Sequence, residues 1–251
     1  MEADFTGRSV LVTGGGTGLG RAVALAFASR GAGVLVTGRR EGPLIGTAEL
    51  ARERGAEAIP MTGDVSSGPD VESWVRTALE RFGRLDFACN NAATEGAGGS
   101  IVDETHEDFD RAVAVNLRGT WLCMKYEMRA MKQDGRGAIV NMSSLNAERS
   151  AAGYAAYCAA KAAVESLTRT AALEGAADGI RVNALRAGAF ATEMLERAHS
   201  PQERSALAAE IPLGRIGDPS EAAEFVTWLC SDASSYVTGQ SLTIDGGLTA
   251  S

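Results

Sequence analysis

Short apolar runs alternate with longer amphipathic segments along the whole chain. The runs are rich in Val, Leu and Ile and lack strict apolar-polar alternation, which is typical of parallel strands buried on both faces of a sheet. We predict strands at 9–13, 33–37, 58–62, 85–89, 138–142, 180–184 and 241–245. Apolar residues at helical spacing predict helices at 21–28, 42–55, 69–82, 105–115, 117–133, 154–176 and 220–229, with 189–214 irregular or loosely helical.

This alternation predicts an α/β fold: a single Rossmann-type doubly wound parallel sheet with helices on both faces. The chain has 251 residues, of which 45% are hydrophobic and 22% charged, an ordinary globular composition. No linker and no break in composition interrupts it. We therefore expect one catalytic domain over 1–251.

Charge and composition exclude several classes of function. The 24 basic and 32 acidic residues give a net charge of −8, so we expect no nucleic-acid partner. The apolar runs are too short for a membrane span, and the acidic opening segment 1–7 lacks the apolar region of a signal peptide, so we expect a cytoplasmic protein. Two histidines and four widely spaced cysteines disfavour a metal site, a disulfide framework and Ser-His or Cys-His nucleophilic catalysis.

Glycine is abundant, with 30 residues, and five of these glycines lie in the segment that follows the first predicted strand. The segment 13–20 reads Thr-Gly-Gly-Gly-Thr-Gly-Leu-Gly, in which Gly14, Gly18 and Gly20 form G-x-x-x-G-x-G. A glycine turn between a strand and a helix offers backbone N–H groups and a helix dipole to a pyrophosphate. No register fits a P-loop. The alternative is a turn that needs glycine only for tight packing.

The end of the second predicted strand bears on the choice of dinucleotide. Residues 36–40 read Val-Thr-Gly-Arg-Arg, so the tip lacks the carboxylate that binds the ribose of NAD in many Rossmann domains. Arg39 offers a planar fork suited to a 2′-phosphate, which favours NADP over NAD. Alternatively, both arginines are solvated surface, and Glu41 further along complicates the choice.

Tyr157 and Lys161 are candidates for acid/base chemistry. They are four residues apart in a predicted helix and therefore share a face. A nearby ammonium lowers the pKa of a phenol from its usual value of about 10, so the pair suits a general acid/base. The alternative is a partly buried tyrosine beside the aliphatic part of a lysine.

Further motifs follow in chain order: Asp64-Val65 after the third predicted strand, Asn90-Asn91-Ala92-Ala93 after the fourth, Asn116 between two helices, and Ser144, 13 residues before Tyr157. With the glycine turn and the Tyr157 and Lys161 pair, they resemble the motifs of a single-domain, ketoreductase-like short-chain dehydrogenase/reductase. The likeness runs from about Arg8 to Gly247. Ala93 stands where that family commonly has glycine.

The resemblance implies reversible hydride transfer between NADP(H) and a small ketone or secondary alcohol, by an enzyme that forms homotetramers. The catalytic residues that it implies are Asn116, Ser144, Tyr157 and Lys161. The cofactor-binding residues that it implies are Gly14, Thr17, Gly18, Leu19, Gly20, Arg39, Asp64, Val65, Asn91, Tyr157, Lys161, Gly188 and Thr192. Asn116 would hold a water of a proton relay. Lys161 would bind the nicotinamide ribose and lower the pKa of Tyr157.

One segment departs from the family pattern. The family commonly has Pro-Gly where this chain has Ala187-Gly188, so we expect a more mobile loop beside the nicotinamide. Residues 189–214 fall where the family has its substrate lid. We expect Leu145, Asn146, Glu148, Arg149 and Tyr154 to line the pocket and His199 to lie at the surface. The lid residues Met194, Leu195, Leu207 and Ile211 suggest an apolar pocket wall, and packing within a lid helix explains them equally well.

Two rival functions remain open. One is an NAD-linked alcohol or sugar dehydrogenase, which the absence of an acidic residue at Gly38 disfavours. The other is a non-catalytic NADP-binding sensor. A sensor has no use for an acid/base pair, so the Tyr157 and Lys161 set favours an enzyme.

Overall fold

The computed structural model describes residues 4–250, so the first three residues of the opening segment and Ser251 lie outside it. Seven strands form one parallel sheet in the order β3-β2-β1-β4-β5-β6-β7. The strands are β1 (Ser9–Thr13), β2 (Gly33–Gly38), β3 (Ala58–Thr62), β4 (Phe87–Asn90), β5 (Gly137–Ser144), β6 (Ile180–Ala187) and β7 (Ser241–Ile244). The α-helices are α1 (Gly18–Ala28), α2 (Glu41–Arg52), α3 (Gly68–Phe82), α4 (His106–Val113), α5 (Gly119–Asp134), α6 (Ala155–Gly175), α7 (Glu193–Ala198), α8 (Pro201–Glu210) and α9 (Pro219–Cys230).

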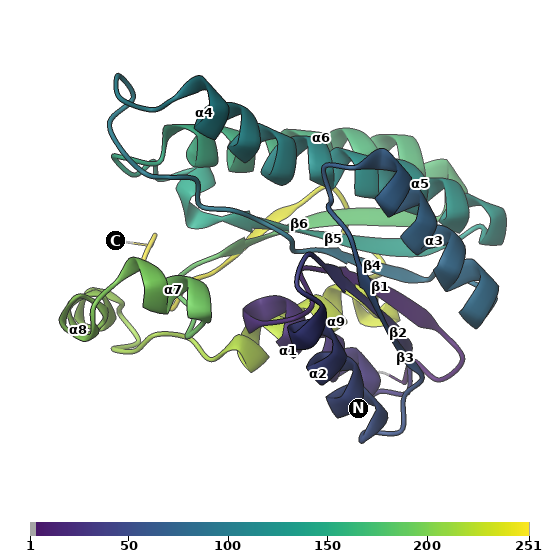
Figure 1. Ribbon diagram of the computed structural model, residues 1–251. Coiled ribbons are helices and arrows are strands. Elements are labelled where there is room, and N and C mark those ends of the chain that lie inside the picture. The colour runs from purple at the N-terminus through teal and green to yellow at the C-terminus, as the bar shows by residue number, and fades with distance from the viewer. Residues whose placement is uncertain (1–3, 251) are drawn as a thin grey trace.

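Helices cover both faces of the sheet, as the sequence predicts for a doubly wound fold (Figure 1). Val10 and Val12 of β1 pack into the core on the side of α1, α2 and α9. Leu11, which points to the opposite face, packs with α3 and α5. The central strands β1 and β2 are buried on both faces, and their sequences are accordingly dominated by Val and Leu.

The predicted boundary of the fourth strand is wrong by two residues. Residues 85–89, Leu-Asp-Phe-Ala-Cys, are predicted as the strand, but β4 starts at Phe87. Asp86 precedes it, and its buried carboxylate accepts hydrogen bonds from the Ser9 N–H at 3.0 Å and from Arg84 at 2.6 and 2.7 Å. This side chain therefore fixes the start of β4 against β1. At the other end of the sheet β5 runs two residues beyond its predicted end, to Ser144, and β6 runs three residues beyond, to Ala187, and the two strands pair throughout.

Two segments have more structure than the sequence indicates. A π-helical turn, Ala114–Arg118, links α4 to α5 at the place where two separate helices are predicted. The segment 189–214, predicted to be irregular, contains α7 and α8. The Ser200 hydroxyl accepts from the Glu203 N–H while the Glu203 carboxylate accepts from the Ser200 N–H, a capping box that starts α8.

Within residues 4–250, none of the helices has both the length and the apolar composition needed to cross a bilayer. The same residues contain no cluster of three or more His, Cys, Asp or Glu side chains that could hold a metal ion. All four cysteines are buried free thiols.

Candidate active site

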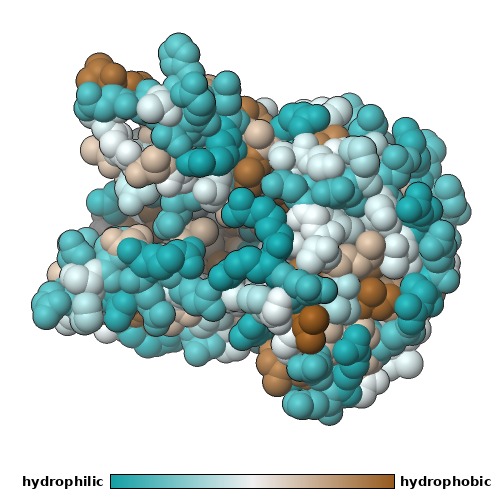
Figure 2. Space-filling model, in the orientation of Figure 1, coloured by the Kyte–Doolittle hydropathy of each residue, from teal (hydrophilic) through white to brown (hydrophobic). Residues whose placement is uncertain are grey.

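A cavity of about 750 Å³ opens at the carboxyl ends of the strands, where open α/β sheets bind ligands. In the space-filling view the molecule is hollowed on the side where α7 and α8 face α4 (Figure 2). The wall includes most residues that the sequence assigns to cofactor and catalysis: Gly14, Thr17, Gly18, Leu19, Arg39, Asp64, Val65, Asn91, Ser144, Tyr157, Lys161, Gly188 and Thr192. Gly20 and Asn116 are not part of it.

The glycine turn after β1 is packed too closely for side chains. A Cβ on Gly20 would lie 2.3 Å from the Gly14 carbonyl oxygen, so Gly20 supports the turn from behind rather than lining the cavity. Gly14 has φ +63°, and a Cβ there would lie 2.8 Å from Nδ2 of Asn91. Asn91 Nδ2 donates to the Thr13 and Gly14 carbonyls at 3.1 and 3.2 Å. The Asn91 side chain thus ties the turn to the end of β4.

The N-terminus of α1 presents free backbone donors to the cavity. Its N-cap residue, Thr17, makes no side-chain capping bond among the described residues, and the first turn holds no acidic side chain. The first N–H groups of a helix need partners, and together with the helix dipole they favour an anion. The Gly14–Leu19 region lining this end of the cavity therefore fits a pyrophosphate.

The tip of β2 lies at the far end of the same cavity. Gly38 and Arg39 line it, and Arg39 is exposed. Arg40 instead pairs with Glu193 of α7 at 3.5 Å, which bridges the mouth of the cavity. Asp64 faces the same region. Burial raises the pKa of its carboxyl, whereas hydrogen bonds from Ser66 and the Arg39 charge lower it. The lowering effects together are the larger, so the net shift of the Asp64 pKa is downward.

Ser144, Tyr157 and Lys161 meet at the other end of the cavity. Ser144 ends β5, while Tyr157 and Lys161 lie one turn apart on α6. The Ser144 hydroxyl hydrogen-bonds with the Tyr157 phenol. Lys161 is buried, and its Nζ donates to the Met142 carbonyl at 2.6 Å and lies 5.7 Å from the centre of the Tyr157 ring.

The pKa of Tyr157 is raised in this structure, whereas the sequence predicts that Lys161 lowers it. Burial raises the pKa of the Tyr157 phenol, the Ser144 hydrogen bond lowers it, and the Glu95 charge raises it. Burial also lowers the pKa of the Lys161 amino group to about 8. The ammonium is directed at the Met142 carbonyl, and it is not among the causes of the tyrosine shift.

Asn116 lies fully buried in the π-helical turn, outside the cavity wall. Its amide Nδ2 donates to the Thr94 carbonyl and its Oδ1 accepts from the Thr94 N–H, both at 2.9 Å. π-Helical turns are common at functional sites. The side chain of Asn116 therefore fixes the loop after β4, which enters the cavity wall at Glu95.

The lid segment forms one side of the cavity. Met194, Leu195 and Leu207 line it as predicted, whereas Ile211 does not. His199, predicted at the surface, is half-buried in the cavity wall, and its Nδ1 is buried without a hydrogen-bond partner in the described structure. The turn after α7 brings it inward, which the spacing of apolar residues does not indicate.

On the opposite side, Leu145, Asn146 and Tyr154 line the cavity as predicted. Glu148 and Arg149, which were also expected there, do not line it. Both point instead to partners that hold their loop: Glu148 accepts from Arg186, and Arg149 donates to the Leu248 carbonyl at 3.2 Å.

Glu95 lines the cavity and was missed by the sequence reasoning. It follows the Asn90-Asn91-Ala92-Ala93 segment by two residues, and that position was the only available signal. Burial raises the pKa of its carboxyl, while the charges of Arg197 and His199 lower it.

The expected mobile loop at Ala187 is not supported by the backbone pairing. Ala187 is the last residue of β6 and pairs with Ser144 of β5 and Ile244 of β7. The Gly188 N–H then donates to the Ile244 carbonyl at 2.9 Å. The position without proline is therefore built into the sheet.

Comparison with known proteins gives matches along the whole chain. A family model described as "Enoyl-(Acyl carrier protein) reductase" matches residues 14–249. "Short chain dehydrogenase/reductase astE" of Aspergillus oryzae is 39% identical over 255 residues, covering 99% of this chain and 97% of the relative. The chain belongs to the short-chain dehydrogenase/reductase family.

Two further relatives of this short-chain dehydrogenase/reductase have more specific names. The 2,5-dichloro-2,5-cyclohexadiene-1,4-diol dehydrogenase of Sphingobium indicum is 40% identical over 251 residues, with 99% of both chains covered. The crystal structure of NAD⁺-bound xylitol dehydrogenase has a TM-score of 0.92 and 33% identity, and the match covers 97% of this chain and 99% of that one. The family fold and its oxidoreductase activity class thus apply to this chain.

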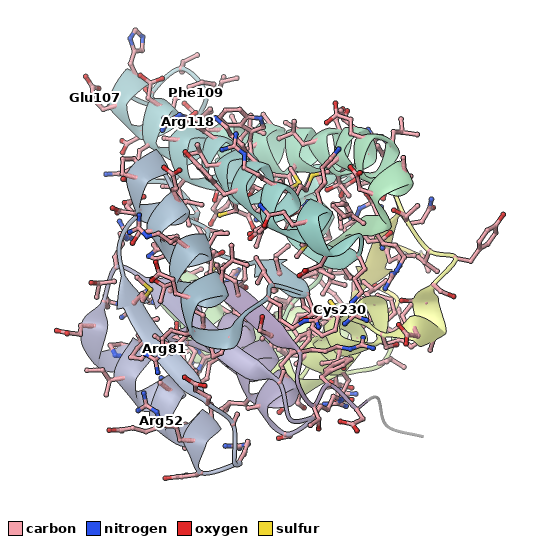
Figure 3. The ribbon with its side chains drawn as sticks, turned by 90° about the vertical axis from the view of Figure 1, so that its right-hand side faces the viewer. Arg52, Arg81, Glu107, Phe109, Arg118 and Cys230 are labelled. Atoms are coloured by element: carbon pink, nitrogen blue, oxygen red, sulfur yellow. The ribbon has the colours of Figure 1, made fainter. Side chains whose placement is uncertain are left out.

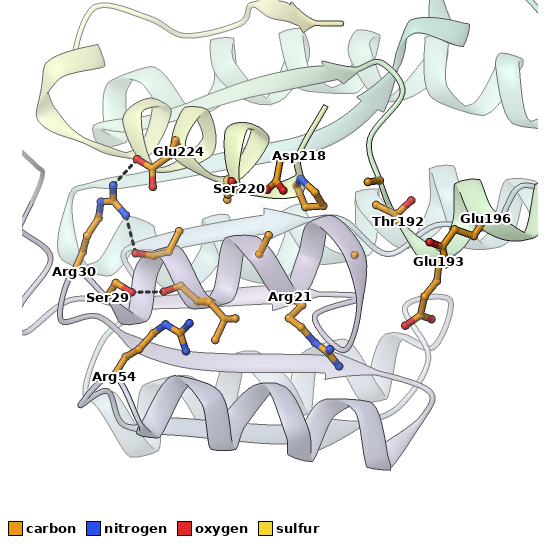
Figure 4. Close-up of a pocket in the computed structure, with 17 residues that line it drawn as sticks. Arg21, Ser29, Arg30, Arg54, Thr192, Glu193, Glu196, Asp218, Ser220 and Glu224 are labelled. Carbon is orange, nitrogen blue, oxygen red and sulfur yellow. Dashed lines mark hydrogen bonds and ion pairs between the residues drawn. The ribbon is translucent and has the colours of Figure 1, made fainter. Parts of the chain in front are cut away.

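A second groove, of about 710 Å³, lies between α1 and α9 (Figure 4). Arg30 spans it, with an ion pair to Glu224 at 2.6 Å. Its wall contains none of Ser144, Tyr157 and Lys161. The chemistry of this short-chain dehydrogenase/reductase is therefore assigned to the larger cavity.

Proposed function

We propose that the protein is an NADP(H)-dependent oxidoreductase that transfers a hydride reversibly between nicotinamide and a ketone or secondary alcohol, within one dinucleotide-binding catalytic domain. The observation that supports this most strongly is a single cavity. One end has the glycine turn and the uncapped start of α1, and the other end has Ser144, Tyr157 and Lys161. A sensor that only binds the dinucleotide needs no such acid/base group.

In this proposal each of the three side chains has a separate role in carbonyl reduction. A bound nicotinamide supplies the hydride to the carbon. Ser144 holds the substrate oxygen by a hydrogen bond, and Tyr157 gives its phenolic proton to that oxygen. Lys161 supplies positive charge beside the phenolate that remains and holds the nicotinamide ribose. Oxidation of an alcohol uses the same groups in reverse.

Asn116 belongs to this machinery as a positioning residue. Its two hydrogen bonds to Thr94 fix the loop that carries Glu95 into the cavity. The Asn116 carbonyl accepts from the Thr120 hydroxyl at 2.8 Å. The same carbonyl could also hold the relay water that the family resemblance implies.

Arg39 supports the choice of NADP. It is exposed on the cavity wall, and residue 38, at the end of β2, is glycine rather than an acidic residue. A guanidinium pairs well with a phosphate dianion. The NAD⁺-bound xylitol dehydrogenase keeps NAD as the second candidate.

The substrate is a small carbonyl compound or alcohol. Leu145, Met194, Leu195 and Leu207 make the substrate end of the cavity largely apolar. The names of the compared proteins, a cyclohexadienediol dehydrogenase and a xylitol dehydrogenase, are consistent with an alcohol-oxidising direction as well.

We also propose a homotetramer formed through α5, α6 and β7. Trp121 on α5 is 44% exposed and Leu173 on α6 is 82% exposed, which is costly for large apolar side chains in water. Light scattering on a sizing column measures the assembly directly. A monomer would contradict this part of the proposal.

The function is tested by following NADPH or NADH absorbance with a panel of cyclic ketones, β-ketoesters and secondary alcohols. We expect Tyr157→Phe to lose turnover by about 10²-fold or more, because it lacks the proton, while NADPH affinity measured by fluorescence stays nearly unchanged. Tyr236→Phe is the matched control, since Tyr236 is fully exposed. Turnover near that of the wild type in Tyr157→Phe would contradict the assignment.

A further inference from the structure

Two polar side chains in the cavity take no part in the acid/base chemistry. Glu95 comes from the loop after β4 and His199 from the turn after α7, and both line the wall that includes Ser144 and Tyr157. The Glu95 charge acts electrostatically on Tyr157, and the His199 and Arg197 charges act on Glu95. Glu95 therefore lies in the same cavity wall as Tyr157 and His199 and within electrostatic range of both.

Neither side chain makes a hydrogen bond within the part of the chain that the structure describes. The Nδ1 atom of His199 is buried without a partner, whereas the Glu95 carboxylate is half-buried and lines the cavity. Arg197 also lines the cavity, but its side chain is 62% exposed and lies 4.0 Å from Glu193. Buried polar groups nearly always have partners, so a ligand group is the natural complement.

The chemistry of the two side chains specifies that ligand group. An ionised carboxylate only accepts hydrogen bonds, whereas an imidazole nitrogen either donates or accepts according to its tautomer. A hydroxyl both donates and accepts, so it satisfies both. A substrate carboxylate would be repelled by Glu95. The apolar wall formed by Leu145, Leu195 and Leu207 suits a hydrocarbon frame.

We propose that Glu95 and His199 bind a second hydroxyl group of the substrate, so that the preferred substrates are diols and hydroxyketones with an apolar carbon frame. The reacting C–O group lies at Ser144 and Tyr157, and the second hydroxyl lies between the β4 loop and the lid. This inference rests on the proposed oxidoreductase function. It names residues that select the substrate, while the acid/base residues stay the same.

The test compares trans-cyclohexane-1,2-diol with cyclohexanol, which differ by one hydroxyl. For the wild type we expect kcat/KM for the diol to exceed that for cyclohexanol by about 10-fold or more. Glu95→Ala and His199→Leu each lower the ratio of kcat/KM for the diol to kcat/KM for cyclohexanol by about 10-fold or more. The ratio is the readout because removal of the Glu95 charge acts on Tyr157 equally for both substrates. Two substitutions at different elements keep the test valid if one variant fails to fold.

Matched controls come from α4. Glu107 and His106 are exposed there, outside the cavity, and Glu107 projects from the end of the molecule (Figure 3). Glu107→Ala and His106→Leu remove the same chemical groups, and we expect both substrates to keep their kcat/KM values.

The possible failures are distinguishable. Equal losses for diol and cyclohexanol, or no loss for either, would overturn the hydroxyl site while leaving the oxidoreductase function in place. A wild-type protein that binds NADPH but turns over no alcohol or ketone would overturn the proposed function and this site with it.

Discussion

Glu127 is a buried carboxyl group whose ionisation opposes folding. It lies on α5 over β4 with no exposed surface, and Nδ2 of Asn90 donates to its Oε2 at 3.0 Å. Its Oε1 has no partner in the described structure. Burial raises the pKa of Glu127 from 4.5 to about 8, against a lowering by the Asn90 hydrogen bond. The folded protein therefore keeps Glu127 neutral at pH 7, whereas the unfolded chain ionises it.

The pH dependence of stability follows from this difference. Between pH 4.5 and about 8 the folded state binds one more proton than the unfolded state, so stability falls as pH rises. The slope is about 1.4 kcal/mol per pH unit. Across the whole interval the loss is on the order of 5 kcal/mol, and it levels off above the folded-state pKa. The loss is a large share of the net stability of a typical domain.

Glu127→Gln removes the titration and keeps an oxygen that accepts from Asn90. Urea unfolding at pH 5.5, 6.5, 7.5 and 8.5, at one protein concentration, gives the free energy of unfolding of both proteins. We expect the advantage of the variant to grow by about 1.4 kcal/mol per pH unit up to about pH 8. Glu107→Gln on the exposed face of α4 controls for loss of charge alone. A stability difference that is constant with pH would refute the reasoning.

Three further outcomes are expected. Arg39→Ala lowers the ratio of kcat/KM for NADPH to that for NADH. An unchanged ratio would show that Arg39 is a solvated surface residue that does not bind the 2′-phosphate. Lys161→Met loses turnover but raises the free energy of unfolding at pH 7, because it removes a buried charge. This gain in stability shrinks between about pH 8 and 10.5, where the folded wild-type protein has lost the proton of Lys161 and the unfolded chain still holds it. Urea unfolding at several pH values measures the change. Arg186→Met costs about 3–5 kcal/mol in urea unfolding because the buried Glu165 carboxylate loses its counter-charge and keeps the Ser143 hydroxyl as a donor, and adding Glu165→Met restores most of this loss.

The sequence predicts the sheet well because buried parallel strands are apolar on both faces. The ends of the strands are harder to predict. β5 continues through Ser143 and Ser144, whose polar side chains interrupt the apolar run, because β6 pairs with them and the Ser143 hydroxyl donates to Glu165 at 2.8 Å. Partners so distant in sequence do not affect the local spacing of apolar residues, so that spacing does not predict where β5 ends.

The same limit applies to the site. The motifs locate the residues that we propose for cofactor binding and proton transfer, because each motif is a short local pattern at the end of a strand or on one helix face. Glu95 and His199 come together only through the path of two loops separated by about a hundred residues. Glu127 is a further case, because a glutamate on an amphipathic helix normally predicts an exposed position.

Arg186 links β6 to α6 and to the loop after β5, next to Ala187, where the family commonly has proline. Its guanidinium donates to both carboxylate oxygens of Glu165 on α6, at 2.9 and 2.7 Å, and also pairs with Glu148 in the loop after β5. Glu165 lies one turn beyond Lys161, and Glu148 lies four residues beyond Ser144. One side chain on β6 thereby connects α6, which carries Tyr157 and Lys161, to the loop that follows Ser144. A proline fixes only its own backbone angle, whereas this ion pair fixes the spacing between Ser144 and Lys161.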